Sequence, residues 1–348
     1  MVKMKDVAAK AGVSVATVSN VFTGRHFVSP DVKEKVLKAV EDLDYHVNLN
    51  ARGLKTSRTK TIGVVLPDIT KLFFNEVMRG ILECAEKHGY RIIVLSSYFD
   101  FTVERECISS LRGLNVDGII LDSCCDYHNL KSWANELANY EGRYTPIVFI
   151  ENAMDDNLVS SVTIDAYYWS SRVTKYLLSL GKKRILFISG PLSLRQEHDR
   201  LEGYKQALKD AGIKIQDSLI LKSDFSSNSS YDIMNGLLSK SPKFDAVQAS
   251  NDEAAIGALK ALNEHGIIVP EDIPVCGFDN LFPSTFVSPG LTTVSVPRRE
   301  IGSEAANECI HHIEDPSLPH RCVVLSAELV KRGSTESGAG TTWDLVYW

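Results

Sequence analysis

The sequence lacks several patterns that define common classes of protein. It has no run of about 18 apolar residues, the length that a membrane-spanning helix needs. Its first residues, MVKMKDVAAKAGV, contain no long apolar core of the kind found in a secretory signal. We therefore expect a cytoplasmic protein that has no contact with a membrane.

Cysteine and histidine are present, but they are not arranged as a metal or redox site. The seven cysteines form no CxxC pair, and the nine histidines form no HExxH motif or Cys/His cluster. Adjacent Cys124 and Cys125 could form a redox switch, although a bond between neighbours strains the backbone. Reduced, buried thiols are the simpler interpretation. We expect no metal and no other cofactor.

Phosphate-binding fingerprints are missing as well. Neither GxGxxG nor a GxxxxGKS or GxxxxGKT motif follows a predicted strand, so a nucleotide-dependent activity has no support. Aspartates such as Asp68, Asp122 and Asp279 stand at the ends of predicted strands, but no nucleophile is paired with a base. We expect that the protein is not an enzyme.

The net charge of −6 hides an asymmetry between the first sixty residues and the rest. Residues 1–60 hold 11 Lys and Arg against 6 Asp and Glu, a net charge of +5. The remainder holds 27 against 38, a net charge of −11. A basic segment on an acidic body suggests that only the first segment meets a polyanion, although a solvated charged face gives similar numbers.

The basic segment contains three predicted short helices, at residues 4–11, 15–22 and 30–43. Gly12 supplies a left-handed turn after the first helix, and Ser14 is an N-cap for the second. Two short helices joined by a glycine-containing turn and braced by a third are typical of a helix-turn-helix domain. An ordinary small helical bundle has the same spacing.

The second predicted helix carries slim side chains on its outer side. Val18, Val21 and Phe22 are expected to pack inward. The side chains expected to face outward are those of Val15, Ala16, Thr17, Ser19 and Asn20. A helix in a major groove about 12 Å wide uses such residues: methyl groups for thymine, hydroxyls for phosphates and an amide for adenine. The pattern therefore favours DNA binding.

This segment closely resembles the N-terminus of the LacI–GalR family of bacterial transcription regulators. The family pattern DVA-x-x-AGVS-x-x-TVS-x-V is met by DVAAKAGVSVATVSNV, and the later N-x-x-AR-x-L and IGV by NLNARGL and IGV. The resemblance extends to about Ser334 and implies four parts. These are a helix-turn-helix DNA-binding domain at 1–46, a hinge helix and linker at 47–60, an effector-binding and dimerisation domain at 61–334, and a C-terminal tail at 335–348.

By position, the resemblance assigns base reading to Val15, Ala16 and Asn20. Leu54 matches a leucine that the family wedges into the minor groove at the operator centre, which bends the duplex. Phosphate contacts are assigned to Lys5, Ser14, Thr17, Ser19, Arg25 and Lys55. The implied partner is double-stranded DNA, a near-palindromic operator bound by a homodimer.

From Ile62 onward, short apolar runs alternate with amphipathic segments in two successive rounds. Strands are predicted at 62–68, 91–97, 117–123, 146–152, 184–190, 218–225, 245–252 and 273–279, with helices between them, one at 201–211. The fold class is therefore an α head plus an α/β body with two doubly wound subdomains. The resemblance to the LacI–GalR family also implies that this body is similar to periplasmic sugar-binding proteins. We expect an N-subdomain at about 61–163 and 293–321 and a C-subdomain at about 164–292 and 322–334.

The resemblance also assigns a cleft for a small-molecule effector. Its predicted residues are Phe73 and Phe74 as cleft-lining aromatics, Arg200 as a grip on ligand oxygens, Phe225 as a stacking aromatic, and Asn251 and Asp279 as polar contacts. Aromatic faces with such polar groups suit a polyhydroxylated ring. The alternatives are that the three phenylalanines pack in the core and that Arg200 forms a surface ion pair. Leu194 stands where purine-responsive members have a basic residue, so a sugar or sugar derivative is favoured.

These observations predict a sequence-specific DNA-binding repressor of metabolic genes that is controlled allosterically by a carbohydrate. Two alternatives remain open. One is a catabolite-control-type regulator with a protein co-effector. Arg298 and Arg299 neither favour nor exclude this alternative. The other is a cytoplasmic solute-sensing module without a role on DNA.

Overall fold

The computed structural model describes residues 2–23, 26–45, 58–154, 158–240 and 243–337. The predicted DNA contacts Arg25, Leu54 and Lys55 lie outside these residues, as does most of the predicted hinge. The chain forms two compact units, Met1–Thr59 and Lys60–Trp348, which we describe separately as the head and the body.

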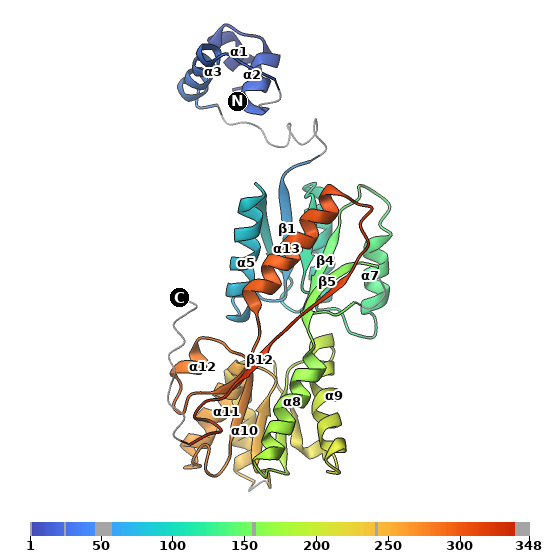
Figure 1. Ribbon diagram of the computed structural model, residues 1–348, viewed down its shortest axis with the longest axis vertical. Coiled ribbons are helices and arrows are strands. Elements are labelled where there is room, and N and C mark those ends of the chain that lie inside the picture. The colour runs from blue at the N-terminus through green and yellow to red at the C-terminus, as the bar shows by residue number, and fades with distance from the viewer. Residues whose placement is uncertain (1, 24–25, 46–57, 155–157, 241–242, 338–348) are drawn as a thin grey trace. The chain divides into compact units, whose positions relative to one another are not determined.

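The head contains three helices, α1 (Met4–Ala11), α2 (Val15–Thr23) and α3 (Pro30–Asp42) (Figure 1). Gly12 ends α1 in the left-handed conformation, with a φ of 66°, which a residue without Cβ adopts without strain. Ser14 caps α2, because its Oγ accepts a hydrogen bond of 3.0 Å from the Thr17 N–H. Val18 and Val36 are fully buried between the helices. The predicted helix-turn-helix arrangement is confirmed.

The body consists of two lobes, each built on a six-stranded sheet (Figure 1). The first sheet has the order β11-β5-β4-β3-β1-β2, and its strands are all parallel. These strands are β1 (Thr61–Leu66), β2 (Arg91–Ser96), β3 (Gly118–Leu121), β4 (Ile147–Ile150), β5 (Ser160–Ile164) and β11 (Cys322–Leu325). The helices of this lobe are α5 (Phe73–Lys87), α6 (Phe101–Gly113), α7 (Leu130–Ala138) and α13 (Arg298–Glu314).

The second sheet has the order β12-β10-β9-β8-β6-β7, with only its edge strand β12 antiparallel. These strands are β6 (Ile185–Ser189), β7 (Ile220–Lys222), β8 (Ala246–Ala249), β9 (Val275–Asp279), β10 (Thr292–Ser295) and β12 (Glu328–Val330). The helices are α8 (Ala166–Ser179), α9 (Arg195–Asp210), α10 (Ser227–Leu238), α11 (Asp252–Glu264), α12 (Pro283–Phe286) and the 3-10 turn Asp217–Leu219. The two predicted doubly wound sheets are confirmed.

The central strands are short apolar runs because helices cover both faces of each sheet. Strands β3 and β4 read GIIL and IVFI, and every residue in them is buried. On one face of the first sheet, α5 and α13 lie side by side (Figure 1). They approach so closely that a Cβ on Gly80 would lie 2.0 Å from the Arg299 carbonyl oxygen. Glycine at this position therefore permits the packing of the two helices.

The predicted subdomain boundaries are wrong at two strands. Strand β10 pairs with β9 in the second sheet, although residues 293–321 were expected in the first subdomain. Strand β11 pairs with β5 in the first sheet, although residues 322–334 were expected in the second subdomain. The described connections between the lobes follow β5, β10 and β11. Strands β10 and β11 have four residues each. The sheet that each one joins depends on a partner strand far away in the chain, which the local sequence pattern does not reveal.

Two further boundaries differ from the prediction. Helix α9 begins at Arg195 and not at 201. The sequence pattern does not reveal this start, because the first turn is polar and shows no apolar stripe, although Glu197 is fully buried there. The predicted tail does not begin at 335. Thr335 is buried, and its Oγ1 accepts a hydrogen bond of 3.0 Å from the Tyr176 hydroxyl, so residues 335–337 belong to the body.

All seven cysteines are free, and five of them are buried. Burial raises the pKa of the Cys125 thiol to about 12, which disfavours the thiolate that disulfide formation requires. The expectation of buried thiols holds for these five, whereas Cys107 and Cys322 are only partly buried. No helix in the described part of the chain is long and apolar enough to cross a membrane.

Candidate functional sites in the head and in the body

The first candidate site is the outer side of α2 in the head. Val15 is 46% exposed and Ala16 is also exposed, whereas Val18 on the opposite side is completely buried. The remaining predicted contacts on this helix, Thr17, Ser19 and Asn20, are partly exposed. The burial pattern thus leaves slim and hydroxylic side chains on the surface, as the sequence predicts.

Two of the predicted phosphate contacts are hydrogen-bonded to each other. The hydroxyls of Ser14 and Thr17 lie 2.9 Å apart, so one donates to the other. Because each hydroxyl has one donor, the accepting hydroxyl keeps its own O–H for another oxygen. Lys5, on α1, is exposed.

The second candidate site is a cleft of about 570 Å³ between the two lobes of the body, partly open to solvent. All six predicted effector residues line it, namely Phe73, Phe74, Arg200, Phe225, Asn251 and Asp279. The first lobe adds Pro67, Lys71, Phe99, Asp122 and Glu151, and the second adds Gln196, Glu253 and Leu281. The cleft lies at the carboxyl ends of β1, β3, β4, β6, β8 and β9, the usual place for a ligand in open α/β sheets.

Aromatic rings from both lobes contribute to the cleft. Phe73 and Phe74 form an edge-to-face pair with ring centres 5.3 Å apart. Phe99 from the first lobe and Phe225 from the second have ring centres 6.0 Å apart. A Cβ on Gly190 would lie 2.2 Å from the Phe225 ring, so the absence of a side chain there makes room for that ring.

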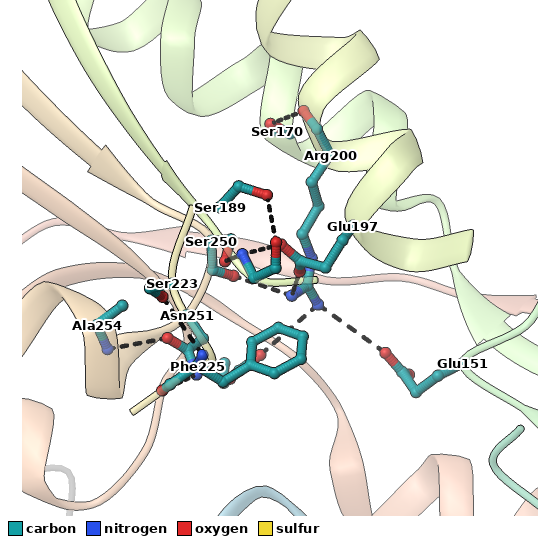
Figure 2. A network of polar contacts seen from close by, with 12 residues as sticks. Glu151, Ser170, Ser189, Glu197, Arg200, Ser223, Phe225, Ser250, Asn251 and Ala254 are labelled. Carbon is teal, nitrogen blue, oxygen red and sulfur yellow. Dashed lines mark hydrogen bonds and ion pairs between the residues drawn. The ribbon is translucent and has the colours of Figure 1, made fainter. Parts of the chain in front are cut away.

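Arg200 projects from α9 into the polar part of the cleft and is only 4% exposed. Its guanidinium donates hydrogen bonds of 2.9 Å to Glu197 Oε1 and to the Ser250 carbonyl oxygen. Figure 2 shows the guanidinium between the Glu197 and Glu151 side chains. Its second terminal nitrogen lies 3.9 Å from Glu151 Oε2 and 3.8 Å from Asp279 Oδ1. Three carboxylates therefore surround one cation.

Sequence reasoning missed Glu151, although a signal was present. The residue follows β4 directly in the run IVFIEN, where a polar side chain reaches the carboxyl edge of the sheet. Its φ of 59° is in the left-handed region, so its backbone is held in a conformation that is uncommon outside glycine. Such strain is frequent where a side chain has to point into a functional site.

Burial dominates the electrostatics of the cleft. It raises the pKa of Asp122 and Asp279 well above their usual range, and Arg200 only partly opposes the effect on Asp279. Burial also raises the pKa of Glu151, again opposed by Arg200. Behind the cleft, burial raises the pKa of Asp252 to about 7. Protons are therefore held more tightly here than on carboxyls in water.

Asn251 has a local structural role in addition to lining the cleft. Its side-chain oxygen accepts a hydrogen bond of 2.9 Å from the Ala254 N–H and so caps α11. Its amide donates a bond of 3.1 Å to the Phe225 carbonyl oxygen. The residue therefore fixes the loop that presents the Phe225 ring.

The comparisons with known proteins cover both units. Residues 3–48 match the sequence profile described as "Bacterial regulatory proteins, lacI family". Residues 59–330 match the profile "Periplasmic binding proteins and sugar binding domain of LacI family". The chain belongs to the LacI family of bacterial regulatory proteins.

Three curated relatives match along nearly their full length. The transcriptional regulator RegA of Clostridium saccharobutylicum is 37% identical over 95% of this chain and 98% of the relative. Catabolite control protein A of Priestia megaterium is 34% identical over 96% and 99%. The ribose operon repressor of Escherichia coli K12 is 34% identical over 96% and 100%.

Solved structures support the same assignment. The lac repressor dimer bound to operator and the anti-inducer ONPF superposes with a TM-score of 0.84 at 26% identity, covering 96% of this chain and 99% of that one. The complex of the regulator CelR with cellobiose has a TM-score of 0.71 at 28% identity, covering 96% and 100%. The protein is a DNA-binding transcriptional regulator with a ligand-binding body, and it is not an enzyme.

Proposed function

We propose that this regulator is a repressor that binds a near-palindromic operator as a homodimer and is controlled by a sugar or sugar derivative. The observation that carries the ligand part is the cleft, where rings such as Phe73 and Phe225 stand beside Arg200 and Asp279. An aromatic ring packs against the apolar face of a sugar, and the charged groups bind its hydroxyls. Because its target is bacterial DNA, the protein acts in the cytoplasm.

On the operator, each copy inserts α2 into the major groove. Val15 and Ala16 contact thymine methyl groups, and Asn20 pairs with an adenine edge. Phosphates are bound by Lys5, Ser14, Thr17, Ser19, Arg25 and Lys55, and Leu54 enters the minor groove between the half-sites. The outward position of the described members of this set on the head supports the assignment.

Ligand and operator binding are coupled through the two lobes. A ligand that contacts residues of both lobes stabilises one relative arrangement of them and thereby shifts the population that can bind DNA. Coupling of this kind typically amounts to about 1–3 kcal/mol and is reciprocal, so operator must change ligand affinity by the same factor.

A thermal-shift screen of the full chain against neutral sugars, sugar phosphates and nucleobases tests the ligand class. We expect sugars to raise the unfolding temperature and nucleobases to leave it unchanged. A sugar that binds should also change operator affinity in a mobility-shift assay. Stabilisation by nucleobases alone would contradict the proposal.

A protein co-effector, suggested by the similarity to catabolite control protein A, is a second candidate. Arg298 and Arg299, which could contact such a protein, both bind other residues of this chain. Arg299 forms an ion pair of 2.6 Å with Glu83, and Arg298 donates a bond of 3.0 Å to the Asn280 carbonyl oxygen. The cleft therefore supports a small ligand better than these arginines support a protein partner.

A further inference from the structure

The cleft contains buried polar atoms that have no hydrogen-bond partner. Among the described residues, such atoms on the cleft lining are Glu151 Oε1, Asp279 Oδ1, Gln196 Oε1 and Arg200 Nε. Three are acceptors and one is a donor. A buried polar atom without a partner is costly, so a ligand that fits this cleft has to supply mainly hydrogen-bond donors.

The ionisable groups of the lining have the same bias. Four carboxylates line the cleft, from Asp122, Glu151, Glu253 and Asp279, against the two cations Lys71 and Arg200. Lys71 Nζ is paired with Glu253 Oε2 at 3.0 Å. Arg200 is shared by Glu197, Glu151 and Asp279. Each described cation of the lining is therefore already next to at least one carboxylate.

We propose, on the basis of the effector role proposed above, that the cleft selects its ligand by charge. It binds a neutral or positively charged polyhydroxylated molecule whose hydroxyl or ammonium groups donate to Glu151 and Asp279. It rejects phosphorylated and carboxylated sugars, because their anionic group would lie among acidic side chains, and the described cations of the lining, Lys71 and Arg200, are already paired.

The two carboxyl oxygens without a hydrogen bond, Glu151 Oε1 and Asp279 Oδ1, also belong to different lobes. Glu151 follows β4 of the first lobe, and Asp279 ends β9 of the second. A molecule that donates to both oxygens bridges the lobes, beside the Arg200 guanidinium, which lies 3.9 Å from Glu151 Oε2 and 3.8 Å from Asp279 Oδ1. The same contacts that select the ligand therefore hold the lobes together.

Matched probes differing in charge test the inference by calorimetry on the full chain. One series is D-ribose and D-ribose 5-phosphate, and the other is D-glucose, D-glucosamine and D-glucose 6-phosphate. In the series that binds, we expect the neutral or amino sugar to bind at least about tenfold more tightly than the phosphate. A phosphate that binds equally well or more tightly overturns the inference but leaves the effector role intact.

Failure of the proposed function has a different signature. If no probe of either series binds while sequence-specific DNA binding is observed, the ligand class itself is wrong and the charge selection falls with it.

The substitution Glu151→Gln tests whether Glu151 is responsible for the preference for a neutral sugar over its phosphate. Glutamine keeps the size and one acceptor but removes the charge, so the preference for the neutral sugar over the phosphate should shrink by about tenfold. Glu141→Gln, an exposed position outside the cleft lining, is the matched control and should leave the preference unchanged. Asp279→Asn provides a second variant if Glu151→Gln does not fold. An unchanged preference in both cleft variants contradicts the inference.

Discussion

Lys71 Nζ lies 3.0 Å from Glu253 Oε2, and this ion pair joins the first lobe to the second at the edge of the cleft. A second link is the hydrogen bond of 2.8 Å from the Tyr127 N–H to the Ser193 carbonyl oxygen. The two lobes of the body are therefore in direct contact, one of these contacts lying at the cleft. We expect the strength of these contacts to set how easily a ligand enters and leaves.

We predict that Glu253→Gln weakens ligand binding and accelerates ligand release. Both side chains of the Lys71 pair are about one-fifth exposed, so the loss should be about 1 kcal/mol or less, up to about fivefold in affinity. Glu264→Gln is the control, because Glu264 pairs with Lys260 on the same helix and joins no lobes. Equal affinities for the two variants, measured by calorimetry, would contradict a role for the Lys71 pair.

Asp279→Asn should weaken the response to ligand while leaving operator affinity unchanged. Its φ of 107° is uncommon for any residue with a side chain, and asparagine tolerates positive φ better than alanine. The substitution replaces the carboxyl group beside Arg200 by an amide and changes one acceptor that has no hydrogen-bond partner. Mobility-shift titrations with and without sugar measure both effects. Loss of operator binding as well would make Asp279 a structural residue.

Asp252 should make the body less stable as the pH rises from about 4 to 7. Its folded pKa of about 7 lies above the usual value of 3.8 for this side chain, so between these values unfolding releases a proton. The stability present at low pH is lost as the pH rises through this window, by at most about 4 kcal/mol. Asp252→Asn lacks this dependence. Urea unfolding of both proteins at pH 4.5 and 7.5 measures it, and parallel stabilities would refute the assignment.

Asn20→Ala should cost about 1–3 kcal/mol of operator affinity and relax the preference at one base position in each half-site. Lys5→Ala is the informative contrast. It should weaken binding to all sequences alike and reduce the dependence on salt by about one phosphate contact. A uniform loss across sequences for Asn20→Ala would assign this residue to phosphate contact.

The sequence predicts best where a residue's role depends on its near neighbours. Gly12, Ser14 and the buried Val18 follow from spacing within a dozen residues, and the structure has all three as expected. Five of the six predicted effector residues come together in one cleft because they stand at or near the ends of strands and helices, whereas Arg200 reaches the cleft from within α9.

Prediction fails where the outcome depends on distant partners. Strands β10 and β11 are short, and each is assigned to its sheet by a neighbour far away in the chain. Glu151 gains its importance from Arg200, which lies on another lobe, and no local pattern links the two. Likewise, Thr335 looks like part of a polar tail until its contact with Tyr176 is known.

The central claim is that the head reads a base sequence. Its most direct test is the affinity of the full chain for the best duplex selected from a random pool, relative to a scrambled duplex of the same composition at fixed salt. We predict a near-palindromic selected sequence and a preference of about 10³-fold or more. Equal affinity for the two duplexes would contradict the account.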